Sequence, residues 1–256
     1  MNNSNVRKAI ILAAGRGRRL SNTIHSMQPK ILLTFGGKTL LERHIENLEQ
    51  VGVEEIYIVI GYQHEKIENF LKKIRKKTIK SKIFTIFNED YMYGSIVSLS
   101  KASHVLESGE RMLLMDGDVL YSPEILLILT KTKFENCLLL DMNIEAGDEP
   151  VKICLEDDLI VDFAKLPEKN FTKYGESVGF FLLSKEISIA LSHEISNALK
   201  KGQIINEYED PLRNLIINSK GKTFCYENIS GLPWIEIDFP QDIENANKLI
   251  LESKIK

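Results

Sequence analysis

IILAAGRGRRL, residues 10–20, is an apolar run that ends in small residues and then in arginines. Such a run predicts a buried strand that opens into a loop able to surround a polyphosphate. Gly15 and Gly17 allow a concave turn in which main-chain N–H groups reach phosphate oxygens. Positive charge comes from four basic residues nearby, Arg16, Arg18, Arg19 and, after Pro29, Lys30. The stretch therefore predicts a nucleotide site at the end of the first strand.

The composition is that of a globular enzyme. Of the 256 residues 43% are hydrophobic, enough for one large α/β domain or two small ones. The 33 basic and 36 acidic residues are intermixed, with a formal net charge of -3. Because this balance creates no field that would hold a nucleic acid backbone, we expect no nucleic acid partner. The basic run at residues 72–77 is typical of a solvated helix face.

The cysteines and the first residues bear on location. Cys137, Cys154 and Cys225 are few, odd in number and far apart, which argues against a disulfide framework and a zinc site. This usage predicts a reducing, cytoplasmic environment. Residues 1–5 are polar and are expected to be disordered, and we expect neither a signal sequence nor a membrane span.

The first half of the chain alternates β-branched runs with amphipathic segments. Strands are expected at residues 6–13, 56–60, 83–87 and 112–115. Helices are expected at residues 40–51, 67–74 and 96–106. This alternation predicts a mostly parallel sheet with helices on both faces, where ligands bind at the carboxyl ends of the strands.

The second half has a different pattern, typical of antiparallel or mixed pairing. Strands are expected at residues 138–142, 151–155, 159–163 and 178–183, with turns at 147–148 and 157–158. Helices are expected at residues 187–199, 211–217 and 241–252. The predicted fold is α/β, a Rossmann-like three-layer sandwich with a mixed, mostly parallel central sheet. No linker or repeat appears, so we predict one domain over residues 1–256, its first half binding a nucleotide and its second half an acceptor.

Two acidic motifs predict a magnesium site. Asp116-Gly117-Asp118 follows the predicted strand at 112–115, which places its carboxylates near the Gly15 loop. Glu236 and Asp238 alternate, so both lie on one face of a strand. Hard oxygen ligands suit Mg²⁺ bridging phosphates. The alternatives are a surface turn at 116–118 and a helix cap at Asp238, and the glycine loop favours the metal.

Two other phosphate-binding motifs are incomplete, because each lacks a glycine at a required position. Gly36-Gly37-Lys38-Thr39 resembles the end of a P-loop, but Leu32 stands where that motif needs glycine. A hairpin turn is the better interpretation. Gly15-Arg16-Gly17 is half of a dinucleotide fingerprint, with Leu20 in the third glycine's place, so a dehydrogenase is disfavoured.

Several motifs occur together and in one order along the chain. They are LAAGRGRRL at 12–20 with Pro29-Lys30, Gly61-Tyr62, DGD at 116–118, FAKLP at 163–167 and EIDFPQD at 236–242. From about residue 6 to residue 251 the chain thus resembles the nucleotidyltransferase family of sugar-phosphate and phosphocholine pyrophosphorylases. Segments 88–99 and 231–238 resemble its CTP-using branch, whose acceptors include phosphocholine, phosphonates and inositol phosphate.

The resemblance implies roles for individual residues. It implies a nucleotide site made by Leu12, Ala13, Ala14, Gly15, Arg16, Gly17, Gly61, Asn88, Ser95 and Asp116. It implies that Arg19 and Lys30 act on the nucleotide phosphates and that Lys165 receives the acceptor's phosphate. It also implies that Asp118 and Asp238 ligate the magnesium ion.

Base and acceptor recognition leave alternatives open. Main-chain groups after Gly61 or the amide of Asn88 suit cytosine, and a turn capped by Asn88 is an equal alternative. NEYED at 206–210 places three carboxylates beside an aromatic ring, which suits a cationic or amide-bearing group. We favour a helix start at Asp210-Pro211 whose dipole accommodates these acids. The expected acceptor residues are Lys165, Glu176, Glu207, Glu209, Asp210, Trp234 and Glu236, with Tyr174 nearby and a core position as the alternative for Trp234.

The leading hypothesis is an Mg²⁺-dependent cytidylyltransferase that transfers CMP from CTP to a small phosphate- or phosphonate-bearing acceptor and releases pyrophosphate. Such an acceptor is already anionic near neutral pH, so no side chain need deprotonate it. The first alternative is a sugar-1-phosphate enzyme that uses UTP or dTTP, and the second is a nucleotide-binding regulator without turnover. The expected partners are CTP and the acceptor, with a homodimer as a candidate assembly and no membrane.

Overall fold

The computed structural model describes residues 6–20, 28–74, 79–143, 150–252 and 254–255. Two predictions, disorder at residues 1–5 and a turn at 147–148, lie outside these residues. In the described part of the chain, no helix combines the length and the apolar character that crossing a membrane requires.

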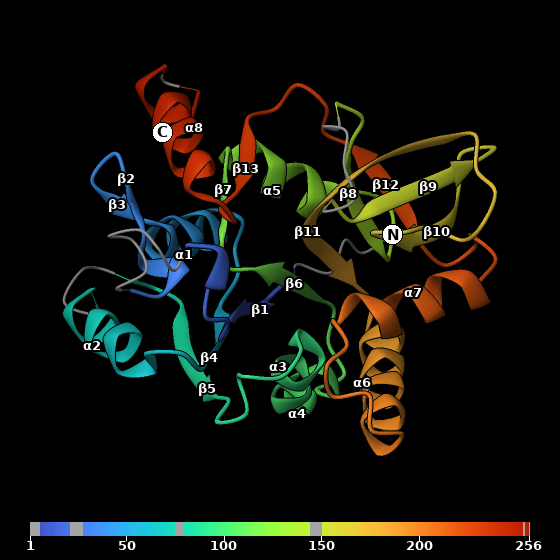
Figure 1. Ribbon diagram of the computed structural model, residues 1–256, viewed down its shortest axis with the longest axis horizontal. Helices are drawn as coiled ribbons and strands as arrows, with labels where there is room; N and C mark the ends of the chain where they lie inside the picture. Colours follow the sequence, from blue (N-terminus) through green and yellow to red (C-terminus); the bar gives the residue numbers. More distant parts are fainter. Residues whose placement is uncertain (1–5, 21–27, 75–78, 144–149, 253, 256) are drawn as a thin grey trace.

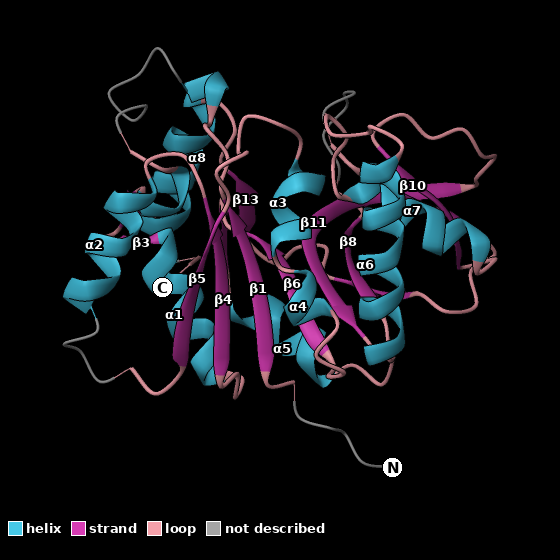
Figure 2. Ribbon diagram, turned by 90° about the horizontal axis from the view of Figure 1, so that it is seen from below, coloured by secondary structure: helices cyan, strands magenta, loops and turns pink. Residues whose placement is uncertain are grey.

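The centre of the sheet is parallel, as predicted. It contains β6 (Met112–Asp116), β1 (Lys8–Ala13), β4 (Glu55–Ile60) and β5 (Lys82–Phe87), hydrogen-bonded in that order. Figure 2 shows these strands side by side. After Lys8, β1 is apolar because it has a strand on each side and helices over both faces. All four strands end at one edge of the sheet, where the chain turns into loops.

The second half of the chain extends this sheet by antiparallel pairing, also as predicted. β11 (Lys173–Leu183) pairs with β6 and continues to β9 (Lys152–Glu156), which pairs with β10 (Leu159–Ala164). β8 (Cys137–Asp141) branches from β11 and carries β12 (Cys225–Asn228) in parallel. The mixed, mostly parallel α/β sandwich is confirmed (Figure 1).

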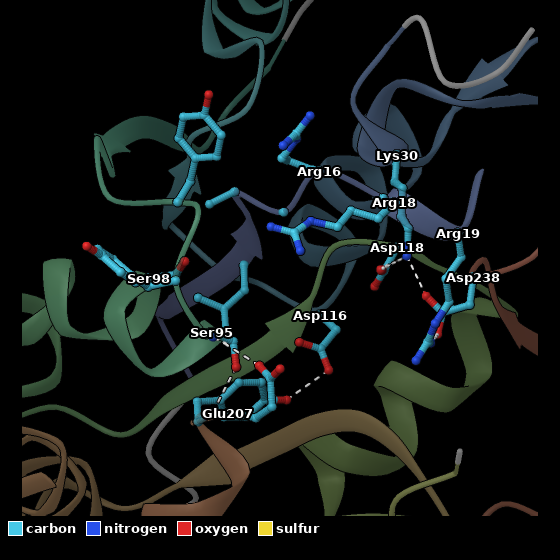
Figure 3. A pocket seen from close by; sticks show the side chains of 18 of the residues that line it. Arg16, Arg18, Arg19, Lys30, Ser95, Ser98, Asp116, Asp118, Glu207 and Asp238 are labelled. Carbon is cyan, nitrogen blue, oxygen red and sulfur yellow. Dashed lines mark hydrogen bonds and ion pairs between the residues drawn. The ribbon is translucent and has the colours of Figure 1, made fainter. Parts of the chain in front are cut away.

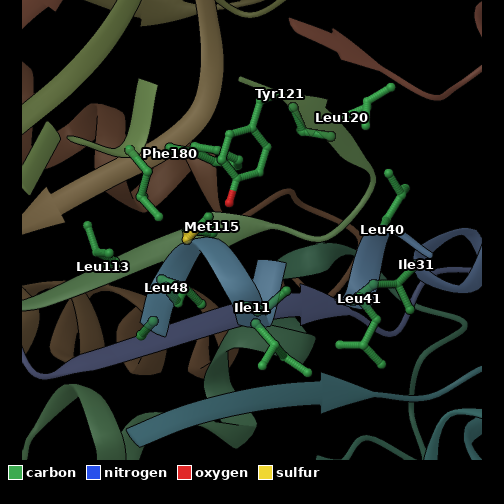
Figure 4. Packing of buried hydrophobic residues seen from close by; sticks show 14 of the residues in the cluster. Ile11, Ile31, Leu40, Leu41, Leu48, Leu113, Met115, Leu120, Tyr121 and Phe180 are labelled. Atoms are coloured by element: carbon green, nitrogen blue, oxygen red, sulfur yellow. The ribbon is translucent and has the colours of Figure 1, made fainter. Parts of the chain in front are cut away.

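Helices cover both faces and divide the core into two clusters. Ile11 of β1 packs in the cluster with α1 (Leu40–Gln50), α2 (His64–Ile74), α5 (Pro123–Lys131) and α8 (Pro240–Leu251). Ile10 faces the other cluster, with α3 (Ser95–Lys101), α4 (Ser103–Leu106), α6 (Lys185–Lys200) and α7 (Glu209–Asn218). Successive residues of a strand point to opposite faces, which explains the division. Figure 4 shows the first cluster, where Ile11, Leu41 and Met115 come from different elements.

Some elements differ from the predictions. The helix expected at 96–106 is divided into α3 and α4 at Ala102, and α5, β12 and the short strand β7 (Val119–Tyr121) were not predicted. The hairpin at Gly36-Gly37 is confirmed, between β2 (Thr34–Phe35) and β3 (Lys38–Thr39). β7 is short and fully buried, so its apolar residues carry no period that distinguishes it from a loop or helix.

Candidate functional site

A cavity of about 590 Å³ opens where β1 and β6 end (Figure 3). Its size is in the usual range for small-molecule sites. The walls come from four parts of the chain, namely residues 12–19, residues 91–95, the turn after β6 and the segment 205–209. Lys165 and the segment after the strand β13 (Trp234–Glu236) complete it.

The glycine loop forms one wall. Leu12, Ala14, Gly15, Arg16 and Gly17 line the cavity, and the space above Gly15 is open. Gly17 has φ +59, and a Cβ there would lie 3.2 Å from the Lys30 side chain, so glycine suits both the turn and the close approach. Of the predicted loop residues, Ala13 instead packs against the core.

Gly61 packs closely against the glycine loop at Ala14. Tyr62 donates its main-chain N–H to the carbonyl of Ala14 at 3.0 Å. A Cβ at Gly61 would lie 2.5 Å from Cβ of Tyr91 and 2.9 Å from the Ala14 carbonyl oxygen. Gly61 therefore lets the β4 and β1 loops approach each other, and it is not among the residues that line the cavity.

The loop arginines differ in their surroundings. Arg16 lies over the ring of Tyr62 at 5.7 Å, near the rim, whereas Arg18 projects into the cavity (Figure 3). Arg19 forms an ion pair with Asp238 at 2.8 Å and lies over the Phe239 ring at 5.1 Å. All three arginines line the cavity beside the glycine loop.

Lys30 lies between two carboxylates. Its Nζ is 2.9 Å from Oδ2 of Asp118 and 2.5 Å from Oδ1 of Asp238 (Figure 3). Burial opposes the charge on Lys30, but the two carboxylates prevail and hold the pKa of the ammonium above its usual range. Lys30 is therefore a permanent cation at the junction of the glycine loop and the acidic cluster.

The acidic cluster consists of Asp118, Glu236 and Asp238. Each offers one carboxylate oxygen, and these atoms lie within 4.8 Å of one another. The cluster forms because β7 pairs with β13 and because Ile237 donates its N–H to the Asp118 carbonyl at 3.0 Å. Three hard oxygen ligands in this arrangement fit a divalent cation such as Mg²⁺.

Asp242 takes the helix-capping role that was the alternative for Asp238. Its carboxylate accepts the main-chain N–H groups of Asp238 and Phe239 at 2.8 and 2.6 Å. The Asp238 side chain is thereby left to Lys30 and Arg19. The structure therefore favours a place for Asp238 in the acidic cluster of the site over a role as the cap of α8.

Asp116 is held by Tyr208 and Gly179. The Tyr208 hydroxyl donates to Oδ2 of Asp116 at 2.8 Å, and Tyr208 itself is buried. Gly179 has φ +75, and a Cβ there would collide with the Asp116 carboxylate. Burial raises the pKa of Asp116, and the charges of Glu209 and Asp118 raise it further.

Ser95 and Glu207 join two walls of the cavity. Ser95 donates its main-chain N–H to Glu207 Oε2 at 3.0 Å, and its Oγ accepts the N–H of Tyr208 at 2.8 Å (Figure 3). Gly94 packs against the carbonyl of Asn206, where a side chain would collide. The segment before α7 is thus fastened to the start of α3.

His44 supports the Asp-Gly-Asp turn from beneath. It is buried on α1, with Nε2 3.3 Å from the carbonyl oxygen of Gly117. Burial lowers the pKa of His44 to about 4, so the ring is neutral at pH 7. Because a carbonyl can only accept, Nε2 carries the proton. No sequence pattern identified this contact, since His44 and Gly117 meet only in the fold.

Lys165 lines the cavity and belongs to a loop that is held in place by hydrogen bonds to the Asp162 side chain. The Asp162 side chain is 0% exposed and accepts two bonds from Arg213 of α7, at 2.7 and 3.1 Å. It also accepts the main-chain N–H groups of Glu168 and Lys169. Burial would raise the pKa of Asp162, but Arg213 and these donors lower it to about 2.

Residues 9–168 match the family model described as "MobA-like NTP transferase domain". The chain belongs to this NTP transferase family. It is 30% identical over 249 residues to the bifunctional protein GlmU of Methanococcus maripaludis, covering 96% of this chain and 55% of that protein. It is 28% identical over 247 residues to the bifunctional IPC transferase and DIPP synthase of Rubrobacter xylanophilus, covering 95% and 52%. The chain thus spans about half the length of these relatives.

Solved structures share the NTP transferase fold. The inositol-1-phosphate CTP transferase from T. maritima superimposes with a TM-score of 0.72 at 21% identity, over 96% of this chain and 97% of that one. Proteins described as a glucose-1-phosphate thymidylyltransferase and a UDP-glucose pyrophosphorylase share it as well. At these identities the likeness shows the fold alone.

Most residues predicted for the NTP transferase site line this cavity, and several do not. Trp234 donates its indole N–H to Asp141 at 2.8 Å, and Asp210 lines a separate cavity of about 240 Å³ beside Arg213. Glu176 is on β11 opposite Asp141, outside the set of residues that line the main cavity. Trp234 and Asp210 are thus engaged outside the main cavity, whereas burial and, in addition, the charge of Glu176 raise the pKa of Glu236 in the acidic cluster.

Asn88 also lies outside the residues that line the cavity. Its Nδ2 donates to Ser98 at 3.0 Å and its Oδ1 accepts the N–H of Asp90 at 2.9 Å. The turn-forming alternative for Asn88 is thus favoured over base recognition. Tyr91, Met92 and Tyr93 line the cavity and lie in the segment 88–99 that resembles the CTP-using branch, although no site role was predicted for these three residues.

Proposed function

We propose that this protein transfers CMP from CTP to a small acceptor that bears a phosphate or phosphonate group, with Mg²⁺ as cofactor and pyrophosphate as the second product. One observation carries the proposal. The glycine loop, Lys30 and the cluster of Asp118, Glu236 and Asp238 share one cavity with Lys165. Two anions can therefore be held face to face, each beside its own lysine.

In this reaction an anionic oxygen of the acceptor attacks the α-phosphorus of CTP. The new P–O bond forms as the bond to the bridging oxygen of the β-phosphate breaks, and pyrophosphate leaves with that electron pair. No proton needs to be removed, because either acceptor already carries an anionic oxygen near neutral pH, and for a phosphate the second pKa of about 6 makes it largely dianionic. Catalysis then consists of positioning and charge neutralisation.

The chain's residues divide this work. Main-chain groups at Gly15 and the side chains of Arg18 and Arg19 bind the triphosphate, and Lys30 meets the charge that develops on it. Lys165 orients the acceptor's phosphate for in-line attack. A magnesium ion held by the three-carboxylate cluster would neutralise phosphate charge and polarise the α-phosphoryl group. The first half of the chain thus binds the nucleotide, and the second half supplies most of the acceptor site.

The choice of CTP is supported by the names of similar proteins, among them an inositol-1-phosphate CTP transferase and a CTP:phosphocholine cytidylyltransferase. A sugar-1-phosphate enzyme that uses UTP or dTTP is the second candidate. The similarity to a protein described as a glucose-1-phosphate thymidylyltransferase favours it.

The test is pyrophosphate release across a panel of CTP, UTP, dTTP and GTP, each with phosphonate, phosphoamine, polyol phosphate and sugar 1-phosphate acceptors. We expect release with CTP, dependence on Mg²⁺, and loss of at least a hundredfold in the Asp118→Asn, Asp238→Asn double variant. Faster release with UTP or dTTP would support the second candidate. Thermal protection by a nucleotide without release from any acceptor would support a binding protein instead.

A further inference from the structure

The Asp-Gly-Asp turn after β6 is held through its main chain at three points. The N–H of Gly117 donates to the Leu12 carbonyl of β1 at 2.9 Å. The carbonyl oxygen of Gly117 lies 3.3 Å from Nε2 of His44 on α1. The carbonyl of Asp118 accepts the N–H of Ile237 at 3.0 Å. Two of these contacts join main chain to main chain, so the third depends on the identity of one side chain, that of His44.

His44 is placed so that its ring serves this contact. The ring is fully buried, with the rings of Tyr121 and Phe180 at 5.4 and 6.3 Å. Its Nδ1 has no hydrogen-bond partner among the described residues. A buried polar atom without a partner costs free energy, which an apolar ring at this position would avoid. The bond to Gly117 is therefore what an imidazole provides here and an apolar ring could not.

The helix that carries His44 also supports the segment that carries Lys30. Leu40, the first residue of α1, donates its N–H to the Leu33 carbonyl at 3.0 Å. Ile31, which follows Lys30, packs in the same core cluster as Leu40 (Figure 4). Lys30 and Asp118 lie 2.9 Å apart at their charged atoms. One helix thus fixes both sides of this ion pair, the lysine through its segment and the aspartate through His44.

We infer that His44 is a positioning residue for the acidic cluster: by holding the Gly117 carbonyl it sets the Asp118 carboxylate where the cluster can take a divalent cation. The inference rests on the proposed function and adds to it a residue that is not among those lining the cavity. Loss of a residue that orients metal ligands typically costs about tenfold to a hundredfold in metal affinity or activity. Binding of CTP without metal should not depend on His44.

Two substitutions separate the hydrogen bond from the bulk of the ring. His44→Phe keeps an aromatic ring in the core and removes the donor, whereas His44→Gln provides an amide N–H at a reach similar to that of Nε2. Ser81→Ala is the matched control. It removes another buried side-chain donor, to the Val53 carbonyl at 2.7 Å, at the edge of the sheet opposite the site. His44→Met replaces His44→Phe if the phenylalanine variant does not fold.

The first measurement is an Mg²⁺ titration of pyrophosphate release from CTP, with the acceptor that the wild type uses best. His44→Phe should need about tenfold to a hundredfold more Mg²⁺ for half-maximal release, with the KM of CTP at saturating Mg²⁺ changed by less than about threefold. His44→Gln should recover most of this loss. Ser81→Ala should need as much Mg²⁺ as the wild type, even if its urea midpoint falls as far as that of His44→Phe.

The second measurement reports binding without turnover. Titration calorimetry of CTP is carried out without an acceptor, in EDTA and in Mg²⁺. In EDTA the wild type and His44→Phe should bind CTP with the same affinity. In Mg²⁺ the wild type should bind CTP more tightly, and His44→Phe should lose most of that gain, because the coupling between metal and nucleotide is reciprocal.

The outcomes separate the inference from the proposed function. An Mg²⁺ titration of His44→Phe that matches the wild type, equal losses in His44→Phe and His44→Gln, or the same shift in Ser81→Ala overturns the inference and leaves the cytidylyltransferase intact. Absence of pyrophosphate release by the wild type with every acceptor overturns the proposed function. In that case an Mg²⁺-dependent gain in CTP affinity that His44→Phe loses and His44→Gln keeps still supports the positioning role, and absence of that pattern overturns it.

Discussion

Asp162 provides the sharpest test of how the acceptor side of the site is held together. Replacing it by asparagine keeps the shape but removes the charge that faces Arg213 at 2.7 and 3.1 Å. Hydrogen bonds to charged groups contribute about 1.5–3 kcal/mol. The pKa gives a second route to the magnitude. Lowering it from 3.8 to about 2 corresponds to about 2.5 kcal/mol of folding free energy at pH 7. Both calculations predict that Asp162→Asn lowers the free energy of unfolding at pH 7 by about 2–3 kcal/mol.

The sign of the pH dependence follows from the direction of that shift. Because the pKa of Asp162 is depressed in the folded state, the stabilisation is fully present above about pH 4. It is lost as the pH falls toward 2, and about half remains at pH 3. The free-energy difference between wild type and variant should therefore narrow below pH 4.

Urea denaturation followed by circular dichroism measures both effects. Curves for the wild type and Asp162→Asn at pH 7, 5, 4 and 3 give the difference in free energy of unfolding between the two proteins, provided that their m-values agree. Asp158→Asn is the matched control, since Asp158 is exposed and lies 3.5 Å from Lys173, so its loss should change stability by less than about 0.5 kcal/mol. If Asp162→Asn lowers the free energy of unfolding by less than about 1 kcal/mol at pH 7, or if the loss becomes larger on acidification, Asp162 does not hold this loop through its charge.

Three further predictions concern the nucleotide side. Lys30→Ala should lower kcat about a hundredfold or more while the KM of CTP changes less than tenfold, since the charge it meets is greatest in the transition state; near wild-type turnover would contradict this. Asp238→Asn should shift the Mg²⁺ titration of pyrophosphate release to concentrations at least tenfold higher, and an unchanged titration would remove Asp238 from the metal site. Gly179→Ala should destabilise the fold by about 1–3 kcal/mol in urea curves and lower activity, because φ is +75 and the new Cβ meets the Asp116 carboxylate. A variant as stable and active as wild type would show that this contact is not needed.

Much of the fold was predictable because strands and helices are encoded by local periodicity. β1, β4, β5 and β6 all occur within two residues of the expected ends, and the change to antiparallel pairing was visible as a change of pattern after residue 136. β7 and α5 were missed, because a short, fully buried strand followed by an apolar helix has neither a period of two nor a clear polar face.

The glycine loop and the two acidic motifs could be proposed as site residues because contiguous motifs carry their chemistry, whereas the role proposed for Lys165 came from the family resemblance. The order of amino acids fixes which residue types are available for phosphates and for a cation. Which of these residues come into contact depends on how the chain folds. The β7–β13 ladder brings Glu236 beside Asp118 and Asp238, and the fold brings Tyr208 to Asp116. It also leaves Oε2 of Glu209 buried with no hydrogen-bond partner among the described residues. It also turns Trp234 and Asp210 away. The physical reason is that a local pattern fixes the face of an element, whereas contacts between residues about 90 to 120 positions apart depend on pairing and packing across the whole chain.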